Sequence, residues 1–439
     1  MPLRLRRAAL LAAGVSVAFT TAVAPPGYAA EAPDRSPAKA GAAWLSGELT
    51  RGLVHNEDLD FDDYGLTIDV ALGLAEVGKK RQVAKIAKAV AADVRNYTTG
   101  VDFGSTDVYA GPTAKAATLA IVAGRDPERF GGVDLIAQLE GLVGKSGRIA
   151  DKSSSDDSSN VVGQAYAVRA LSAASSKRAA KAVSYLLKQQ CGKGFFRLNF
   201  TADPVAAQTC SAAPAADRAP DTDATALATM ALQEGKQTSK VRKAVKRASR
   251  WLAGAQRRNG GFGGGPTTAR PNTNSTGLAG AVLGDLGLED EAAKAAAFAR
   301  RHQAVAVPRC STELDEEAGA IAYDARAVEA GESDGITDAT SDQWRRASAQ
   351  ALPVLAWAPA ATGSLAVSGA ATAEKVRLRL AGVAPGEKVC VTGPGVKEAR
   401  YGGWRSTGLS VDRPADVSSA TYRVVSSDGE TAKVVVDLG

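Results

Sequence analysis

Apolar residues between positions 42 and 351 recur with a helical period, and two kinds of helix alternate along this region. Segments 79–94 and 239–252, KKRQVAKIAKAVAADV and SKVRKAVKRASRWL, have apolar residues on one face and Lys or Arg on the other. Amphipathic helices of this type have one wet side. Six other segments are apolar nearly all round, which is typical of buried helices.

Each of the six apolar helices follows a polar loop. They align on a single position, with the sixth copy fitting least well: Thr67, Lys115, Gln164, Thr225, Thr276 and Ile321. The steps between these positions are 48, 49, 61, 51 and 45 residues. Repeats of this length indicate a stacked helical array. Six buried helices alternating with about six half-exposed ones predict a mainly α fold, a closed toroid of two concentric rings over residues 42–351.

A second repeated element ends the amphipathic helices. Trp251-Leu252 is followed by Gln256, Gly260 and Phe262, and Tyr185-Leu186 by Gln190, Gly194 and Phe196, at the same offsets of five, nine and eleven. This element resembles the repeat of squalene/hopene cyclases and of protein prenyltransferase β subunits. The resemblance spans roughly residues 42–350, implies the α6/α6 toroid of that superfamily, and is compatible with a secreted member of actinobacterial type.

The composition changes after residue 351. Segment 352–363, rich in Pro and Ala, is predicted to be a linker. Period-two patterns follow in residues 364–439, and Asp428-Gly429 is typical of a hairpin turn. We therefore expect a small β-sandwich that resembles bacterial immunoglobulin-like modules, which are usually spacers or adhesion units.

The N-terminus predicts export. Residues 1–29 combine a basic start with an apolar stretch and the small-residue cleavage site Gly27-Tyr28-Ala29, which is typical of a signal peptide. Residues 30–41 are expected to be a linker. The net charge of +6 falls to about +3 without the three arginines of the signal, which argues against nucleic-acid binding. We expect a secreted monomer, extracellular or associated with the cell wall, with no membrane span after signal removal.

The four cysteines suit an oxidising compartment. Cys191 and Cys210 lie in the longest repeat step, as expected for an insertion closed by a local disulfide, which would stabilise the fold by about 3 kcal/mol. Cys310 and Cys390 would then pair, although four cysteines allow three connectivities.

Polar loops precede the apolar helices, and in a toroid of this kind such loops gather at one mouth. The residues that we predict to bind a ligand there are Asp62, Asp63, Tyr64, Thr67, Tyr109, Asp157, Gln164, Asp221, Thr225, Asn274, Thr276 and Glu317. Asp, Asn, Ser and Thr also cap helices, and capping is the alternative explanation for each of them.

Residues 221–226, Asp-Thr-Asp-Ala-Thr-Ala, resemble the Asp-x-Asp-Asp-Thr-Ala motif of class II terpene cyclases. The resemblance implies that Asp223 is the catalytic acid, the residue that in those enzymes protonates an alkene or epoxide. Ala224 replaces the last carboxylate of the motif, and aromatic residues make up only 5% of the chain. A carbocation cascade needs aromatic faces, so both departures weigh against cyclase activity.

Two functions from different classes remain. The first is an exported binding or cell-surface protein, non-catalytic, whose cavity holds an unidentified small molecule or cell-envelope ligand. The vertebrate cobalamin carriers are a similar pairing of a toroid with a β domain. The second is a secreted enzyme, either a degenerate terpene cyclase or a glycan-degrading enzyme with paired carboxylates. No cofactor or metal is expected, because His55 and His302 are the only histidines, and the acidic run 57–63 is better explained as a solvated loop than as a calcium site.

Overall fold

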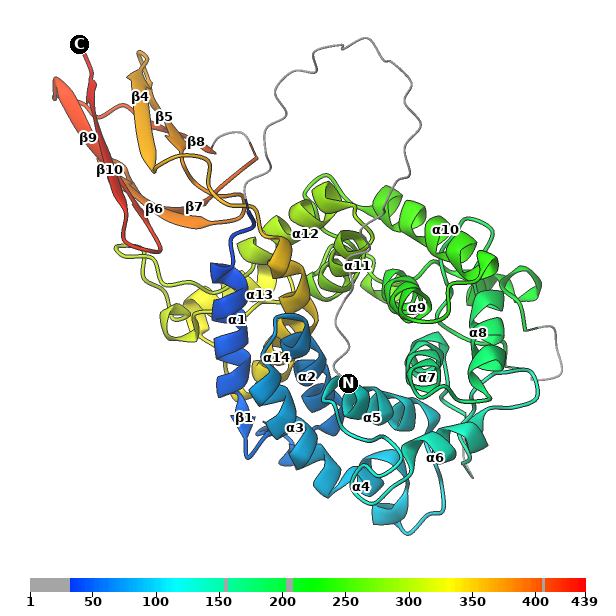
Figure 1. Ribbon diagram of the computed structural model, residues 1–439. Helices are drawn as coiled ribbons and strands as arrows, with labels where there is room; N and C mark the ends of the chain where they lie inside the picture. The colour runs from blue at the N-terminus through cyan, green and yellow to red at the C-terminus, as the bar shows by residue number, and fades with distance from the viewer. Residues whose placement is uncertain (1–31, 154–156, 203–207, 405–406) are drawn as a thin grey trace, which may run out of the picture.

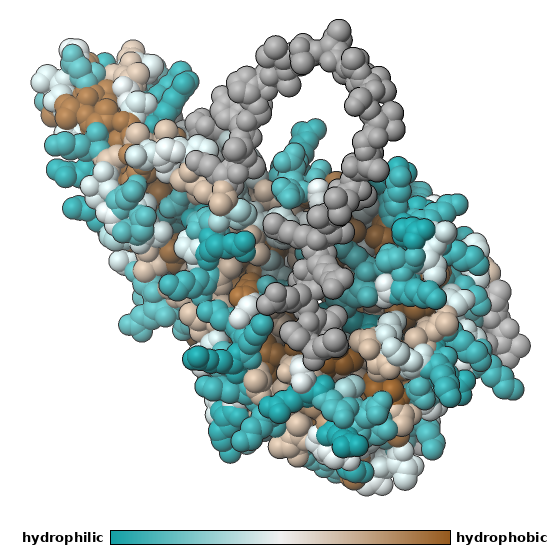
Figure 2. Space-filling model, in the orientation of Figure 1, coloured by the Kyte–Doolittle hydropathy of each residue, from teal (hydrophilic) through white to brown (hydrophobic). Residues whose placement is uncertain are grey.

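A computed structural model describes residues 32–153, 157–202, 208–404 and 407–439, in which a ring of helices carries a β module on one side (Figure 1). The predicted signal peptide, residues 1–29, lies outside the described residues. Figure 2 shows hydrophilic residues over most of the visible face of the ring. Among the described residues, no helix is long and apolar enough to cross a membrane.

Six helices form the inner ring. They are α2 (Tyr64–Glu76), α5 (Ala110–Val122), α7 (Val161–Ala173), α9 (Thr222–Glu234), α11 (Thr273–Asp285) and α14 (Asp338–Ala351). Each packs on the next in this order, and α14 packs back on α2, so the ring is closed. The predicted α6/α6 toroid is confirmed.

The outer ring consists of α1 (Ser36–Gly47), α3 (Lys80–Ala92), α6 (Leu135–Leu142), α8 (Ala179–Lys188), α10 (Ser239–Ala255) and α12 (Glu289–Arg301). Helices α4 (Val94–Thr98) and α13 (Ala325–Asp334) are additional to the two rings. Helix α1 begins at Ser36, so helical structure starts within the segment that was expected to be a linker.

Small residues let the inner helices approach closely. A Cβ on Gly277 of α11 would lie 2.2 Å from the carbonyl oxygen of Gln350, and one on Gly73 of α2 would lie 2.5 Å from that of Ala349. Both carbonyls belong to α14, so glycines on both neighbours admit the sixth inner helix.

The Gln…Gly element of the later repeats fastens one outer helix to the next. Gln256 donates from Nε2 to the carbonyl oxygens of Gly260 (3.0 Å) and Glu291 (2.8 Å). Gln190 makes the same pair of bonds to Gly194 and Ala244. Gly194 and Gly260 have φ of +107° and +88°, which favours glycine.

A third copy of this element closes the ring. Gln303 donates to Gly319 O (3.1 Å) and to Pro37 O of α1 (3.0 Å), and it forms a β-bridge with Ile321. The prediction that Ile321 lies on the sixth apolar helix is therefore wrong. The sixth inner helix is α14, which the apolar pattern missed because its sequence is rich in polar residues.

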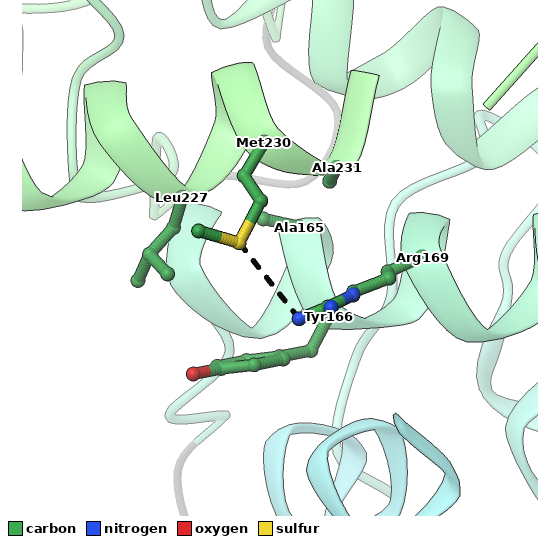
Figure 3. A pocket seen from close by; sticks show the side chains of 6 residues that line it. All are labelled: Ala165, Tyr166, Arg169, Leu227, Met230 and Ala231. Carbon is green, nitrogen blue, oxygen red and sulfur yellow. Dashed lines mark hydrogen bonds between the residues drawn. The ribbon is translucent and has the colours of Figure 1, made fainter. Parts of the chain in front are cut away.

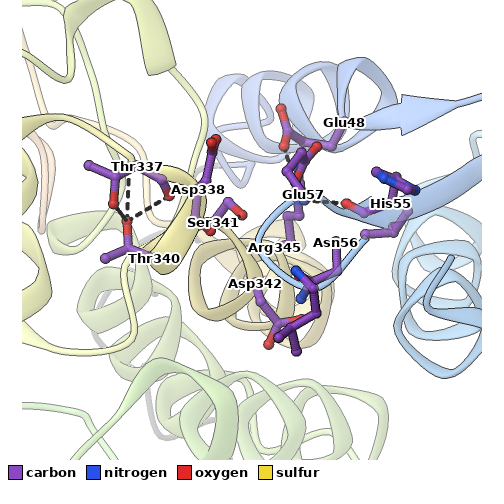
Figure 4. A network of polar contacts seen from close by, with 12 residues as sticks. Glu48, His55, Asn56, Glu57, Thr337, Asp338, Thr340, Ser341, Asp342 and Arg345 are labelled. Atoms are coloured by element: carbon purple, nitrogen blue, oxygen red, sulfur yellow. Dashed lines mark hydrogen bonds and ion pairs between the residues drawn. The ribbon is translucent and has the colours of Figure 1, made fainter. Parts of the chain in front are cut away.

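Arg345 of α14 makes polar contacts across the interface between the last repeat and the first, which we call the seam of the ring (Figure 4). Its Nε lies 2.6 Å from Glu48 Oε2, and its two terminal nitrogens donate to Glu57 at 2.7 and 3.0 Å. Nη1 also donates to the carbonyl oxygen of His55 at 2.7 Å. The guanidinium thus joins α14 to the segment that follows α1.

Two regions contain strands. A short antiparallel sheet, β1 (Leu49–Thr50), β2 (Leu53–Asn56) and β3 (Phe61–Asp62), precedes α2, where the sequence pattern had indicated no strand. The C-terminal module has two sheets. One runs in the order β4 (Ala366–Ala371), β5 (Lys375–Ala381), β8 (Thr407–Asp412). The other runs β10 (Thr431–Asp437), β9 (Ser419–Ser426), β6 (Lys388–Gly393), β7 (Val396–Tyr401).

The predicted β domain is therefore present. Its core contains the inward residues Val376, Leu378 and Leu380 of β5, which the period-two pattern had indicated. Both predicted disulfides are also confirmed. Cys191 pairs with Cys210, and Cys310 pairs with Cys390, which ties the loop after α12 to β6.

Candidate functional site

The polar loops at the start of the inner helices act first as caps. Asp63 accepts a hydrogen bond from Leu66 N (2.7 Å), and Asp221 accepts one from Ala224 N (2.7 Å). Both carboxylates satisfy N–H groups that a helix leaves unpaired. Asp63 also lies 3.3 Å from Arg346 Nη2 of α14, and burial raises the pKa of Asp221. The capping explanation accounts for one oxygen of each residue.

Four of the predicted ligand-binding residues are fully buried and bind the loop that enters their own repeat. Each accepts from a backbone N–H: Thr67 from Val54 (2.8 Å), Gln164 from Ile149 (2.9 Å), Thr225 from Phe196 (2.9 Å) and Thr276 from Phe262 (2.8 Å). Ser348 of α14 does the same for Ile321 (2.7 Å). These side chains fasten the loops to the inner ring.

The remaining predicted residues at the first repeats and at η5 (Asp315–Glu317) contact protein partners. Asp62 lies 3.0 Å from His55 Nδ1, Tyr64 donates to Asp93 (2.9 Å), Asp157 pairs with Arg148 (2.7 Å), and Glu317 accepts from Trp44 Nε1 (2.7 Å). Tyr109 is the half-buried residue that precedes α5. These residues are distributed around the ring rather than gathered at one point.

Asp223 and Asn274 stand apart from the others. Each is the second residue of its helix, α9 and α11, and these two helices are neighbours in the inner ring. Oδ1 of each side chain is buried and has no hydrogen-bond partner among the described residues. An unpaired buried acceptor costs about 1–3 kcal/mol, so two at equivalent positions of adjacent helices need an explanation.

The surroundings of Asp223 favour its neutral form. Burial raises the pKa of this carboxyl to about 6, and the charge of Asp221 adds to the increase, whereas a hydrogen bond from Ser275 opposes it. Glycine at position 264 makes room, because a Cβ there would lie 3.1 Å from Asp223 Oδ2. Burial, with the nearby charge of Asp223, also raises the pKa of Tyr323.

Further along the inner helices, oppositely charged residues pair between neighbours. Lys115 of α5 lies 2.7 Å from Asp69 of α2, and Arg169 of α7 lies 2.6 Å from Glu234 of α9. Burial raises the pKa of Tyr166, with the charge of Asp69 adding to the increase. The helical walls beyond the mouth therefore contain fixed ion pairs.

A small pocket lies between α7 and α9, next to the Arg169 pair (Figure 3). Tyr166, Arg169, Leu227 and Met230 line it, with Ala165 and Ala231. Its volume is about 10 Å³, enough for a single water molecule. This pocket cannot hold a larger ligand. In the described parts of the chain, no group of His, Cys, Asp and Glu is arranged to hold a metal ion.

Comparisons with known proteins agree with this architecture. Residues 158–269, which include Asp223, match the family model of the squalene-hopene cyclase C-terminal domain. A solved structure of the type II terpene cyclase MstE from Scytonema, bound to its product merosterolic acid A, has a TM-score of 0.50 at 14% identity, covering 73% of this chain and 96% of that one. A protein from Actinoplanes has a TM-score of 0.49 at 17% identity, covering 73% of this chain and 98% of that one.

The likeness to MstE shows the fold, and no curated protein matches the sequence significantly. The family-model match and this neighbour confirm the resemblance to the prenyltransferase and squalene-cyclase superfamily that the repeats indicated. Three residues that hold the toroid together were missed from the sequence: Gln303, Arg345 and Ser348. One signal was available, because Phe298 precedes Gln303 by the same five residues that separate Trp251 from Gln256.

Proposed function

We propose that this chain, whose toroid is similar to that of the squalene-cyclase superfamily, is an exported binding protein that holds a small molecule at Asp223 and Asn274. The two buried, unpaired Oδ1 atoms on adjacent inner helices carry the proposal. Both atoms accept hydrogen bonds when Asp223 is ionised, so the ligand must donate them, through hydroxyl groups or a protonated amine. Below a pH of about 6, Asp223 could itself donate to the ligand.

Binding fits the inner ring better than carbocation chemistry does. The inner helices carry the ion pairs Lys115–Asp69 and Arg169–Glu234. Tyr166 is the one aromatic residue among those that line the small pocket between α7 and α9. A migrating carbocation needs aromatic faces and an environment without nucleophilic carboxylates.

Export is supported by the pattern of residues 1–29 and by the pairing of all four cysteines.

A calorimetric titration of the full mature chain with polyols, amino sugars and amines tests the proposal. Asp223→Asn should weaken binding of a hit at least tenfold, because the amide replaces an ionisable acceptor by a weaker one. Asp285→Asn is the matched control: its carboxyl pKa is also raised by burial, but the residue lies at the opposite end of α11. Equal loss of affinity in both variants would refute a ligand site at Asp223.

A second candidate is an acid-catalysed cyclase with Asp223 as the proton donor. The raised pKa of Asp223 favours it, since a carboxyl with a pKa of about 6 retains a useful protonated fraction near neutral pH. One structure of MstE is described as a complex with geranylgeranyl dihydroxybenzoate as substrate. Incubation of the protein with this compound, followed by chromatography, separates the candidates. A cyclised product formed by the wild type and absent with Asp223→Asn would establish catalysis and exclude binding alone.

A further inference from the structure

The β module has one closed side and one open side. Strand β10 packs along β4, which joins the two sheets at one edge, whereas β7 and β8 form the edges of their sheets on the other side and barely touch. A polar groove of about 350 Å³ lies along this open side. Its lining includes Lys375, Lys397, Arg400, Ser410 and Asp412.

The outer face of the three-stranded sheet continues from this groove and is basic. Arg377 and Arg379 of β5 are exposed there, and neither forms an ion pair or a hydrogen bond with any described residue. Asp412, the acid that β8 carries on this face, is engaged by Lys375 at 2.5 Å. The two guanidinium groups are therefore free.

The neighbours of these arginines are small. Arg377 stands between Ala370 of β4 and Ser410 of β8. Arg379 stands in the same way between Ser368 and Gly408. Short side chains on both sides leave shallow strips over β4 and β8, and the two charged groups of β5 stand between these strips. A chain-like ligand can lie along either strip, beside the arginines, without displacing a bulky residue.

We propose that the open side of the β module binds an extended phosphodiester-linked polyol, the chemistry of a polyanionic cell-envelope polymer. Guanidinium groups form paired hydrogen bonds with phosphate oxygens, which suits two free arginines. Arg377 and Arg379 are six backbone bonds apart and therefore about 7 Å apart along the extended strand. A three-carbon polyol phosphate also has six bonds per repeat, so successive phosphates reach successive arginines.

The groove accommodates the continuation of the same polymer. Lys397 is exposed at its rim and has no partner among the described residues, and Arg400 is paired with Glu398 at 2.6 Å. Lys375, Ser410 and Asp412 belong both to the groove and to the basic face, so the two surfaces are continuous. A phosphate one repeat beyond Arg377 would lie at Lys375, which shares the groove with Lys397.

An acidic peptide added as a strand fits this surface less well. It would pair with the free edge of β8. Since neighbouring strands lie about 4.8 Å apart, the added peptide would be about 10 Å from β5. Its side chains would face those of β8, where Asp412 is the only charged residue. The two free arginines would then contribute little, whereas a polymer lying across the face contacts both.

The test uses the full mature chain and a fluorescently labelled poly(glycerol phosphate), with anisotropy as the readout. Arg377→Gln together with Arg379→Gln should weaken binding about tenfold and flatten its salt dependence, because two exposed charge contacts are lost. The control pair is Arg423→Gln with Lys433→Gln. These cations oppose each other on the outer face of the other sheet, so the change in net charge is the same.

Binding that is retained in the control pair and lost in the Arg377/Arg379 pair supports the site. An equal loss in both pairs would mean that net charge alone attracts the polymer and would overturn the proposal. So would equally tight binding of polygalacturonate, a carboxylate polymer, or preferential binding of an acidic peptide. No detectable binding of poly(glycerol phosphate) by the wild type would overturn it as well.

Discussion

Replacing Arg345 by leucine removes the side chain that joins the last repeat to the first. The variant loses the contacts to Glu48 and Glu57 and leaves the carbonyl oxygen of His55 without its donor. Removing one partner of a buried ion pair costs about 3–5 kcal/mol. The side chain of Glu57 is 39% exposed and regains water, so we expect the lower end, a loss of about 3 kcal/mol in the free energy of unfolding.

Urea unfolding followed by circular dichroism measures this loss, and Arg400→Leu is the control. Arg400 and Glu398 form an ion pair of similar length in which both side chains are well exposed, so its removal should cost under about 1 kcal/mol. A loss in Arg345→Leu no larger than in Arg400→Leu would refute the argument that this guanidinium closes the ring.

The pH dependence gives a second readout for the same variant. The hydrogen bond from Arg345 lowers the pKa of Glu57 below its ordinary value of 4.5. A carboxyl with a depressed folded pKa stabilises the fold above its unfolded pKa, and this contribution is lost as the pH falls through the folded value. The difference in stability between the wild type and Arg345→Leu should therefore be constant above about pH 5 and shrink below pH 4.5.

Three further predictions follow from single contacts. Gly277→Val should lower the stability in thermal melts by about 2 kcal/mol or more, because the new Cβ would lie 2.2 Å from Gln350 O. A Cβ at Gly111 would meet no atom within 4 Å, so Gly111→Ala should be neutral or slightly stabilising. The disulfide Cys310–Cys390 joins residues 80 positions apart, so replacing both cysteines by serine should lower the free energy of unfolding by up to about 4 kcal/mol. The β module should then be released faster by a protease, and an unchanged digestion rate would contradict a stabilising role of this disulfide. Asp223→Asn should raise the free energy of unfolding by about 2 kcal/mol above pH 6 and leave it unchanged below pH 4. The reason is that the raised pKa of Asp223 in the folded state makes its ionised form unfavourable. Melting temperatures measured from pH 3 to pH 8 test whether the variant is the more stable protein at high pH.

The helical repeats could be predicted where each copy keeps its own local signals. Thr225 and Thr276 were placed correctly because each lies near the start of an apolar helix, with a leucine seven residues later. The sixth copy failed for a physical reason. Residues 304–318 separate Gln303 from Gly319, so the offsets are lost, although the three-dimensional contacts are kept.

The candidate site divides in the same way. The short motif around Asp223 pointed to this residue, but its unpaired oxygen and raised pKa depend on how Gly264 and Ser275 pack around it. A one-dimensional pattern carries no such information. The same holds for Thr67 and Gln164, whose polar atoms turned out to bind backbone groups of their own repeats.

The seam of the toroid differs in connectivity from its other interfaces, because it joins segments from the two ends of the helical region. Between consecutive repeats the chain itself keeps neighbours together, and Ala- and Gly-rich helices supply the close packing beside ion pairs such as Lys115–Asp69 and Arg169–Glu234. At the seam no covalent connection helps. Arg345 and Arg346 bind α14 to the first repeat, Gly73 lets the two helices approach, and Gln303 holds α1. Salt and low pH weaken ion pairs but scarcely affect apolar packing. The ring should therefore open first at this seam, and hydrogen exchange in α1 and α14 should accelerate before that in α7 and α9 as the pH falls.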